Sequence, residues 1–72
     1  MVTTKGVEIP ADLAGVLRTD ALTLAVFEGM RPSCQRRYAQ WVSEAKSPAT
    51  RARRIAKTAE AVLAYGRRHG KV

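Results

Sequence analysis

The side chains of this 72-residue chain that could carry chemistry are one cysteine, one histidine and many arginines and lysines. Cys34 stands beside Arg36 and Arg37 near the expected start of a helix, an arrangement typical of a reactive thiol. Helical spacing also places it on an apolar face with Tyr38, so we expect a small buried hydrophobe there instead. His69 lies in a basic C-terminal stretch and is expected to be solvated rather than a general base or metal ligand.

No signature of an enzyme stands in the sequence. It has no glycine-rich phosphate loop, no cysteine or histidine pair at metal-ligand spacing, and no Ser, His and Asp set that so short a chain would assemble. We therefore predict no catalytic activity, no metal and no cofactor.

Positive charge is the strongest chemical signal, and it is concentrated in the second half of the chain. Residues 33–72 hold ten Lys or Arg against two acidic residues, whereas residues 1–32 hold three against four, which together make the net charge of +7. This predicts an anionic macromolecule or a protein as partner, with sequence-independent nucleic-acid binding as the alternative. A solvated face that only keeps the protein soluble would carry the same charge. The candidate contacts are Arg53, Arg54, Lys57, Arg67 and Arg68. They belong to a basic ridge that also includes Arg51 and Lys71.

Tyr38 and Trp41 could stack on bases, as aromatic side chains do in single-strand binding proteins. Their spacing instead places them on one helical stripe with Val42, which is typical of a core, so we expect both rings to be buried. Arg37 precedes Trp41 by four residues and is expected to lie over the indole ring.

Two short helices are predicted in the first half of the chain. Pro10 suits the first position of a helix that ends near Thr19, and Asp20 can cap a second helix that begins at Ala21. Gly29 is expected to close this second helix in a left-handed conformation. Apolar residues point to nearly every side of it, which places it at the centre of the core: Leu22, Leu24, Val26 and Phe27.

Two longer helices follow. Ser33 is expected to cap the third, and Ser47 with Pro48 gives the sharpest boundary, that of a fourth helix running to about Tyr65. Arg51 falls near the edge of the fourth helix's apolar stripe and is the basic residue expected to be structural. The predicted stripe is Ala52, Ile55, Ala59, Val62 and Leu63. The fold class is therefore all-α, a small bundle of about four helices.

The expected organisation is a flexible lead-in over residues 1–8, one helical domain over 9–66 and a basic, frayed tail over 67–72. No apolar run is long enough for a signal peptide or a spanning helix. We expect a soluble cytoplasmic protein that is a monomer or a weak dimer.

Beyond these physical patterns, the run Tyr38-x-x-Trp41-Val42-x-x-Ala45-Lys46 followed by Thr50-Arg51-x-x-Arg54-Ile55 resembles the C-terminal motif of the bacterial YdeI/OmpD-associated, or bacteriocin-protection, family. Upstream, Ile9-Pro10-Ala11-Asp12-Leu13 and Phe27-Glu28 are also similar, so the resemblance covers roughly residues 8 to 68. It implies a small helical domain without an established reaction, and the family's name suggests a role in tolerance of bacteriocins or cationic antimicrobial peptides.

The motif positions carried over from that resemblance are Trp41, Lys46, Thr50, Arg51 and Arg54. They suit a binding site, and they also suit a structural corner between the last two helices. In the second interpretation Thr50 lies close to the helix start, while Arg51 and Arg54 reach carbonyl groups or Glu44 across the helix boundary and so set the angle between the helices.

Overall fold

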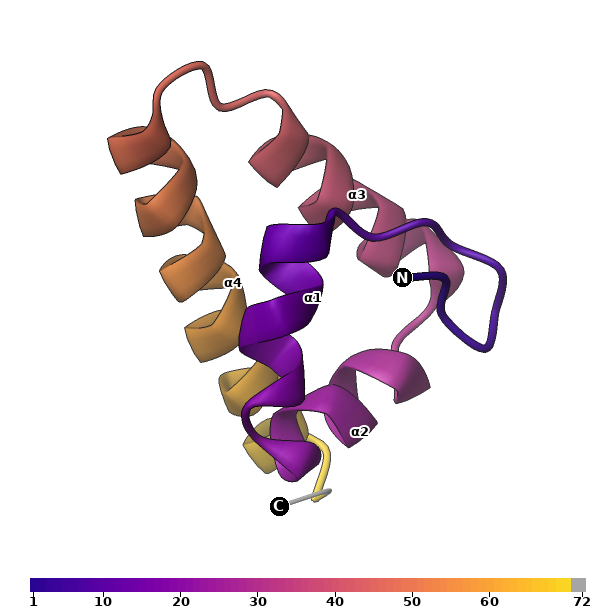
Figure 1. The fold of residues 1–72 in the computed structure, drawn as a ribbon. Coiled ribbons are helices and arrows are strands. Elements are labelled where there is room, and N and C mark those ends of the chain that lie inside the picture. The colour runs from indigo at the N-terminus through magenta and orange to yellow at the C-terminus, as the bar shows by residue number, and fades with distance from the viewer. Residues whose placement is uncertain (71–72) are drawn as a thin grey trace.

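The computed structural model describes residues 1–70, and four α-helices account for most of them, as the sequence predicted. The first two are short and the last two long: α1 Ala11–Arg18, α2 Ala21–Gly29, α3 Pro32–Ser43 and α4 Pro48–Arg68. Helices α3 and α4 diverge from the loop that joins them, α1 lies between them, and α2 crosses near the far end of α4 (Figure 1). Helix α4 contacts each of the other three, so it is the element around which the bundle is packed.

Every helix and the N-terminal segment contribute to one apolar core. Its largest fully buried apolar side chain is Phe27 of α2, whose burial stabilises the fold by roughly 2 to 3 kcal/mol. The other buried apolar residues are Val7, Ile9, Leu13, Ala14, Leu17, Val26, Met30, Ala39, Val42, Ile55 and Val62. The prediction that α2 is surrounded holds for Val26 and Phe27. It is wrong for Leu22, which is 44% exposed in the first turn of the helix.

Two of the predicted caps are present. The Asp20 carboxylate accepts from the amide of Leu22 at 3.1 Å, and the Ser47 hydroxyl accepts from the amide of Thr50 at 3.1 Å. Each bond satisfies an amide that has no partner within the helix.

Other predicted boundaries were wrong. Helix α3 begins at Pro32, ahead of Ser33, and its flanking residue Arg31 makes no side-chain cap. Gly29 stays within α2 and is not left-handed, because the chain leaves the helix through an extended Met30 with φ −74°. The break between α2 and α3 is therefore set by the proline that begins α3, and it needs no left-handed glycine.

The face of α3 that meets the core also differs from the prediction. Gln35, Ala39 and Val42 are its buried residues, whereas Tyr38 and Trp41 are only partly buried. The helix is thus rotated so that a glutamine replaces the aromatic rings at the centre. The Gln35 amide nitrogen donates to the carbonyl of Phe27 at 2.8 Å, and its oxygen accepts from the Thr3 hydroxyl at 2.9 Å, which makes burial of this polar group tolerable.

The N-terminal segment has more anchors than the sequence suggested for a flexible lead-in. Thr3 and Val7 are buried, Val2 pairs with Glu8 in a single antiparallel bridge, and the Lys5 ammonium donates to the carbonyl of Met30 at 2.7 Å. Gly6 occupies the tip of this turn with φ +84°, a conformation that side-chain-bearing residues rarely adopt.

Helix α4 extends to Arg68, three residues beyond the expected end at Tyr65. Arg67 and Arg68 are therefore helical, and the part of the predicted tail at residues 71 and 72 lies outside the described residues. The predicted stripe is correct at its centre, since Ile55 and Val62 are buried. It was wrong for Ala52, which is exposed.

Thr58 and Gly66 join the buried face of α4, although the sequence did not point to them. Thr58 is fully buried. Its hydroxyl can be buried because it donates to the carbonyl of Arg54, one turn earlier, at 2.8 Å.

Candidate functional site

The corner between α3 and α4 gathers several of the motif residues. Arg51, in the first turn of α4, donates through Nε and Nη2 to the two carboxylate oxygens of Asp12 in α1, the second of these at 3.0 Å. Its Nη1 also donates to the carbonyl of Val42, near the end of α3, at 3.3 Å. One guanidinium thus joins three helices, which agrees with the structural role expected of Arg51.

The electrostatics of this pair favour its charged form. The Arg51 guanidinium hydrogen-bonded to Asp12 lowers the pKa of that carboxyl below its usual value, and the carboxylate in turn raises the pKa of Arg51. The side chains remain 31% exposed at Arg51 and 44% at Asp12, so water screens the attraction. The pair orients the helices more than it stabilises them.

Arg54 binds α3 in two ways. Its Nη1 donates to the carbonyl of Trp41 at 2.7 Å, and its guanidinium carbon lies 5.2 Å from the centre of the Trp41 ring. The expectation that Arg37 covers this ring is therefore corrected, because Arg54 from the facing helix does so. Arg54 is also partly buried, so its predicted role as a contact for a partner is replaced by a role within the fold.

The remaining motif positions lie around the same corner. Lys46 is exposed in the loop before α4, and the Thr50 hydroxyl accepts from that of Ser47 at 2.9 Å. Of the five positions, Trp41, Thr50, Arg51 and Arg54 thus make contacts that hold the corner, and Lys46 stands on its surface.

Four of the predicted contact residues share the outer surface of α4: Arg53, Lys57, Arg67 and Arg68. All four are exposed, and at about 100° per residue they fall within an arc of roughly 100° opposite Ile55 and Val62. We call this surface the α4 basic face. Glu60 lies within it and is its one acidic residue along the helix, while the predicted Lys71 lies outside the described residues.

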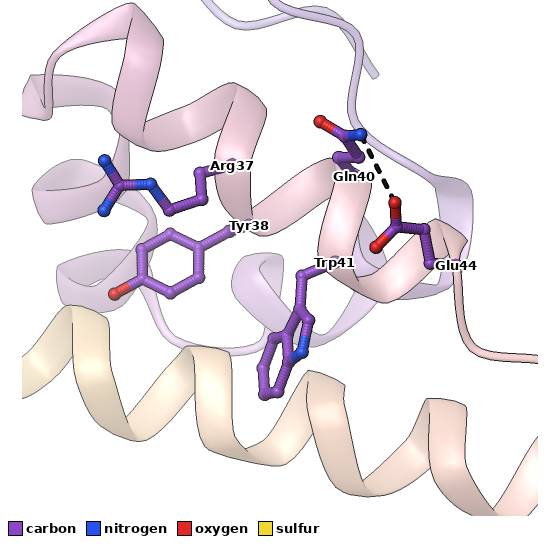
Figure 2. Close-up of a pocket in the computed structure, with 5 residues that line it drawn as sticks. All are labelled: Arg37, Tyr38, Gln40, Trp41 and Glu44. Carbon is purple, nitrogen blue, oxygen red and sulfur yellow. Dashed lines mark hydrogen bonds between the residues drawn. The ribbon is translucent and has the colours of Figure 1, made fainter.

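Beside this corner lies a groove of about 490 Å³ on α3, which we call the aromatic groove. It is lined by Arg37, Tyr38, Gln40, Trp41 and Glu44. Figure 2 shows the Tyr38 and Trp41 rings projecting from α3 toward α4, while Gln40 and Glu44 project to the other side of the helix. The Gln40 amide donates to the Glu44 carboxylate at 3.3 Å. The sequence treated both rings as core and so missed this groove.

The cysteine and the histidine take part in neither feature. Cys34 is partly buried and packs against the core, in keeping with the expected hydrophobic role. His69 follows the end of α4, and its ring lies 4.2 Å from that of Tyr65 in a tilted arrangement. Within residues 1–70, no three His, Cys, Asp or Glu side chains are grouped so that they could hold a metal ion.

Helix α4 is the longest of the described helices, yet neither it nor any other helix within residues 1–70 is long and apolar enough to cross a membrane.

Comparison with known proteins matches one family model to this chain. The model describes bacteriocin-protection, YdeI or OmpD-associated proteins, and it matches residues 6–64. No curated protein and no solved structure gives a significant match. The matched range includes α1, α2, α3 and most of α4, so it covers both the corner and the aromatic groove.

Proposed function

Because the chain belongs to the YdeI/OmpD-associated, bacteriocin-protection family, we propose that it acts as a small basic binding module that captures an anionic macromolecule without catalysing a reaction. The observation that carries this proposal is the α4 basic face. Its four cations stand on the side of α4 that the core does not use, and the arginines that hold the fold together are different residues.

Some basic residues of α4 hold the fold and others face solvent. This separation supports a binding role for the exposed ones over a role in solubility alone. Arg51 and Arg54 make contacts within the fold, whereas Arg53 and Lys57 are exposed on another side of the same helix. A helix that places its cations in one row presents a regular array to a charged polymer. Nucleic acid bound without sequence preference is the second candidate, since the α4 basic face offers arginine and lysine but no amide side chain to read base edges.

Membership of a family of bacteriocin-protection proteins favours a part in bacteriocin tolerance. A protein with a net charge of +7 repels cationic peptides, so we propose that protection operates through an anionic partner inside the cell and not by trapping the peptide. We place the protein in the bacterial cytoplasm for the same reason, because nucleic acids and other polyanions are its available partners there.

A salt titration tests the proposal. A labelled single-stranded oligonucleotide, its duplex and inorganic polyphosphate are each titrated with the protein at several salt concentrations, and binding is measured by anisotropy or by competition. We expect tight binding at low salt that weakens linearly in a log–log plot. The double variant Arg53→Glu/Lys57→Glu removes two phosphate contacts, so the slope for the single strand should fall in magnitude by roughly 1.4.

The matched control is Arg18→Glu/Arg31→Glu, which reverses two exposed cations elsewhere and lowers the net charge by the same four units, from +7 to +3. If binding depends only on total charge, both double variants lose it equally and the proposed site on α4 is wrong. If no polyanion binds the wild-type protein at low salt, the proposed function itself is wrong.

A further inference from the structure

The aromatic groove gives the proposed function a more specific partner. Tyr38 and Trp41 are both partly exposed, and both line the groove beside α4. Because Gln35, Ala39 and Val42 supply the core face of α3, the two rings are left at its edge with part of their surface in solvent. Large aromatic surface at the rim of a small domain is available for stacking.

Two arginines, one on α3 and one on α4, lie beside these rings. Arg37 lines the groove on α3, and Arg54 of α4 covers part of the Trp41 ring. Lys57 follows Arg54 by three residues, about 4.5 Å along the axis, and is turned toward the α4 basic face. Glu44 is the one acidic residue in the lining, and Gln40 donates to it on the other side of α3.

We propose that the aromatic groove binds single-stranded nucleic acid, with bases stacked against Tyr38 and Trp41 and phosphates held by Arg37 and Lys57. This inference rests on the proposed function, since the α4 basic face continues the path of the phosphates away from the groove. Stacking of a base on an aromatic side chain and attraction of phosphates by neighbouring cations are the two contributions that single-strand binding combines.

The spacing of the rings favours an extended strand. Residues three apart on a helix have β-carbons about 5 to 6 Å apart, so the Tyr38 and Trp41 side chains leave α3 at points farther apart than the roughly 3.4 Å between stacked neighbours in a duplex strand. A single strand can open to this spacing, whereas the bases of a duplex are already stacked on one another and cannot reach the rings. An acidic protein segment offers carboxylates to the cations but has no regular array of flat rings for both aromatic side chains.

Trp41 itself reports on the groove, because it is the only tryptophan of the chain. Its fluorescence is titrated at low salt with a short oligothymidylate, with a duplex of equal length and with inorganic polyphosphate. We expect saturable quenching by oligothymidylate, since a stacked base quenches the indole, and little change with the duplex or polyphosphate even where anisotropy or competition shows that they bind.

Variants then separate stacking from charge. Tyr38→Leu keeps an apolar side chain against the core but removes the ring, and should weaken oligothymidylate binding by about 5- to 150-fold, the equivalent of one stacked base. Tyr65→Leu is the matched control, because Tyr65 is partly exposed on α4 but lies outside the groove lining. It should leave the affinity unchanged. Helical circular dichroism and the melting temperature verify that both variants fold, and Arg37→Gln serves as a second groove variant at an exposed position.

The outcomes distinguish this inference from the proposal on which it rests. If polyphosphate and oligothymidylate both bind but Trp41 emission and the Tyr38→Leu affinity stay unchanged, the groove inference is wrong and the α4 basic face remains the site. Equal quenching by duplex and single strand, or equal competition by an acidic polypeptide, also overturns the groove inference. If none of the probes binds at low salt, both proposals fail together.

Discussion

Replacing Gln35 by methionine tests how the N-terminal segment and α3 are held together. Gln35 is fully buried, and its side chain links the Thr3 hydroxyl to the carbonyl of Phe27 at the end of α2. Methionine has nearly the same length and fits an irregular core site, but it makes no such hydrogen bonds. The substitution therefore removes polar contacts while leaving little change in volume.

The size of the effect follows from which groups lose their partners. The carbonyls of Phe27 and Met30 keep other donors, namely the Met30 amide at 3.1 Å and the Lys5 ammonium at 2.7 Å. The Thr3 hydroxyl keeps only its role as acceptor from the Val7 amide, at 3.1 Å, and its buried proton is left without an acceptor. Gln35 also donates to the Glu28 carbonyl at 3.3 Å, and this bond is lost as well. The orphaned Thr3 donor together with the lost hydrogen bonds costs about 2 to 4 kcal/mol. In a domain of this size that lowers the melting temperature by roughly 8 to 30 °C.

A double-mutant cycle gives the decisive measurement. Thr3→Val, Gln35→Met and the double variant are unfolded with urea and followed by circular dichroism. Thr3→Val alone leaves both the Gln35 oxygen and the Val7 amide unpaired. The double variant replaces both partners of the Thr3–Gln35 bond by apolar groups, and the cost of the unpaired Val7 amide cancels in the cycle because Thr3→Val carries it too. We expect the double variant to be more stable than the sum of the two single effects by about 1 kcal/mol or more.

Gln35 lies on the face of α3 that meets the core, and Tyr38 and Trp41 are only partly buried beside it. A Gln35→Met protein with unchanged stability, or a cycle with no coupling between Thr3 and Gln35, would refute this account of how the segment is anchored.

Two further predictions concern the corner. The pKa of Asp12 is lowered by its hydrogen bonds from Arg51, so the unfolded chain takes up the proton at a higher pH than the folded protein does. The stabilisation by this pair is complete above pH 3.8, the ordinary pKa of the carboxyl, and is lost as the pH falls through the lowered value. Asp12→Asn should lower the melting temperature by roughly 1 to 8 °C at pH 7, with a difference that shrinks below about pH 4; a constant difference in calorimetry would contradict this. Ser47→Ala removes a cap and should lower the melting temperature by about 4 to 8 °C. Ser33→Ala, at the position where the sequence predicted a cap that the structure lacks, should have no effect, and equal losses would show that capping is not the cause.

Much of the local architecture could be predicted because it depends on neighbouring residues. Asp20 and Ser47 are followed by the amides that they cap, and Pro48 suits the first turn of α4 wherever that helix lies. The position of positive charge on α4 was also predictable, since the exposed Arg53 and Lys57 lie opposite the apolar stripe. The boundary at Ser33 failed because Pro32 itself begins α3, and a nearby serine does not make a cap without the extended conformation that a cap requires.

The candidate site was less predictable because its contacts cross long distances in sequence. Arg51 meets Asp12, 39 residues away, and nothing in the local pattern of either helix identifies the other as its partner. Arg54 was grouped with the cations for a partner, yet it lies on Trp41 because α3 and α4 diverge from a short loop and bring these two residues together.

Sequence alone determined the four helices, most of their limits, the family and the side of α4 that carries positive charge. Tertiary structure decided which of two adjacent faces of α3 is buried. Helical periodicity shows which residues share a face, and it placed Tyr38 and Trp41 together correctly. Whether that face meets the core depends on the neighbours, and here Thr3 and the end of α2 offer hydrogen bonds to Gln35. A polar side chain could therefore occupy the interior, and the two rings are only partly buried and line the aromatic groove.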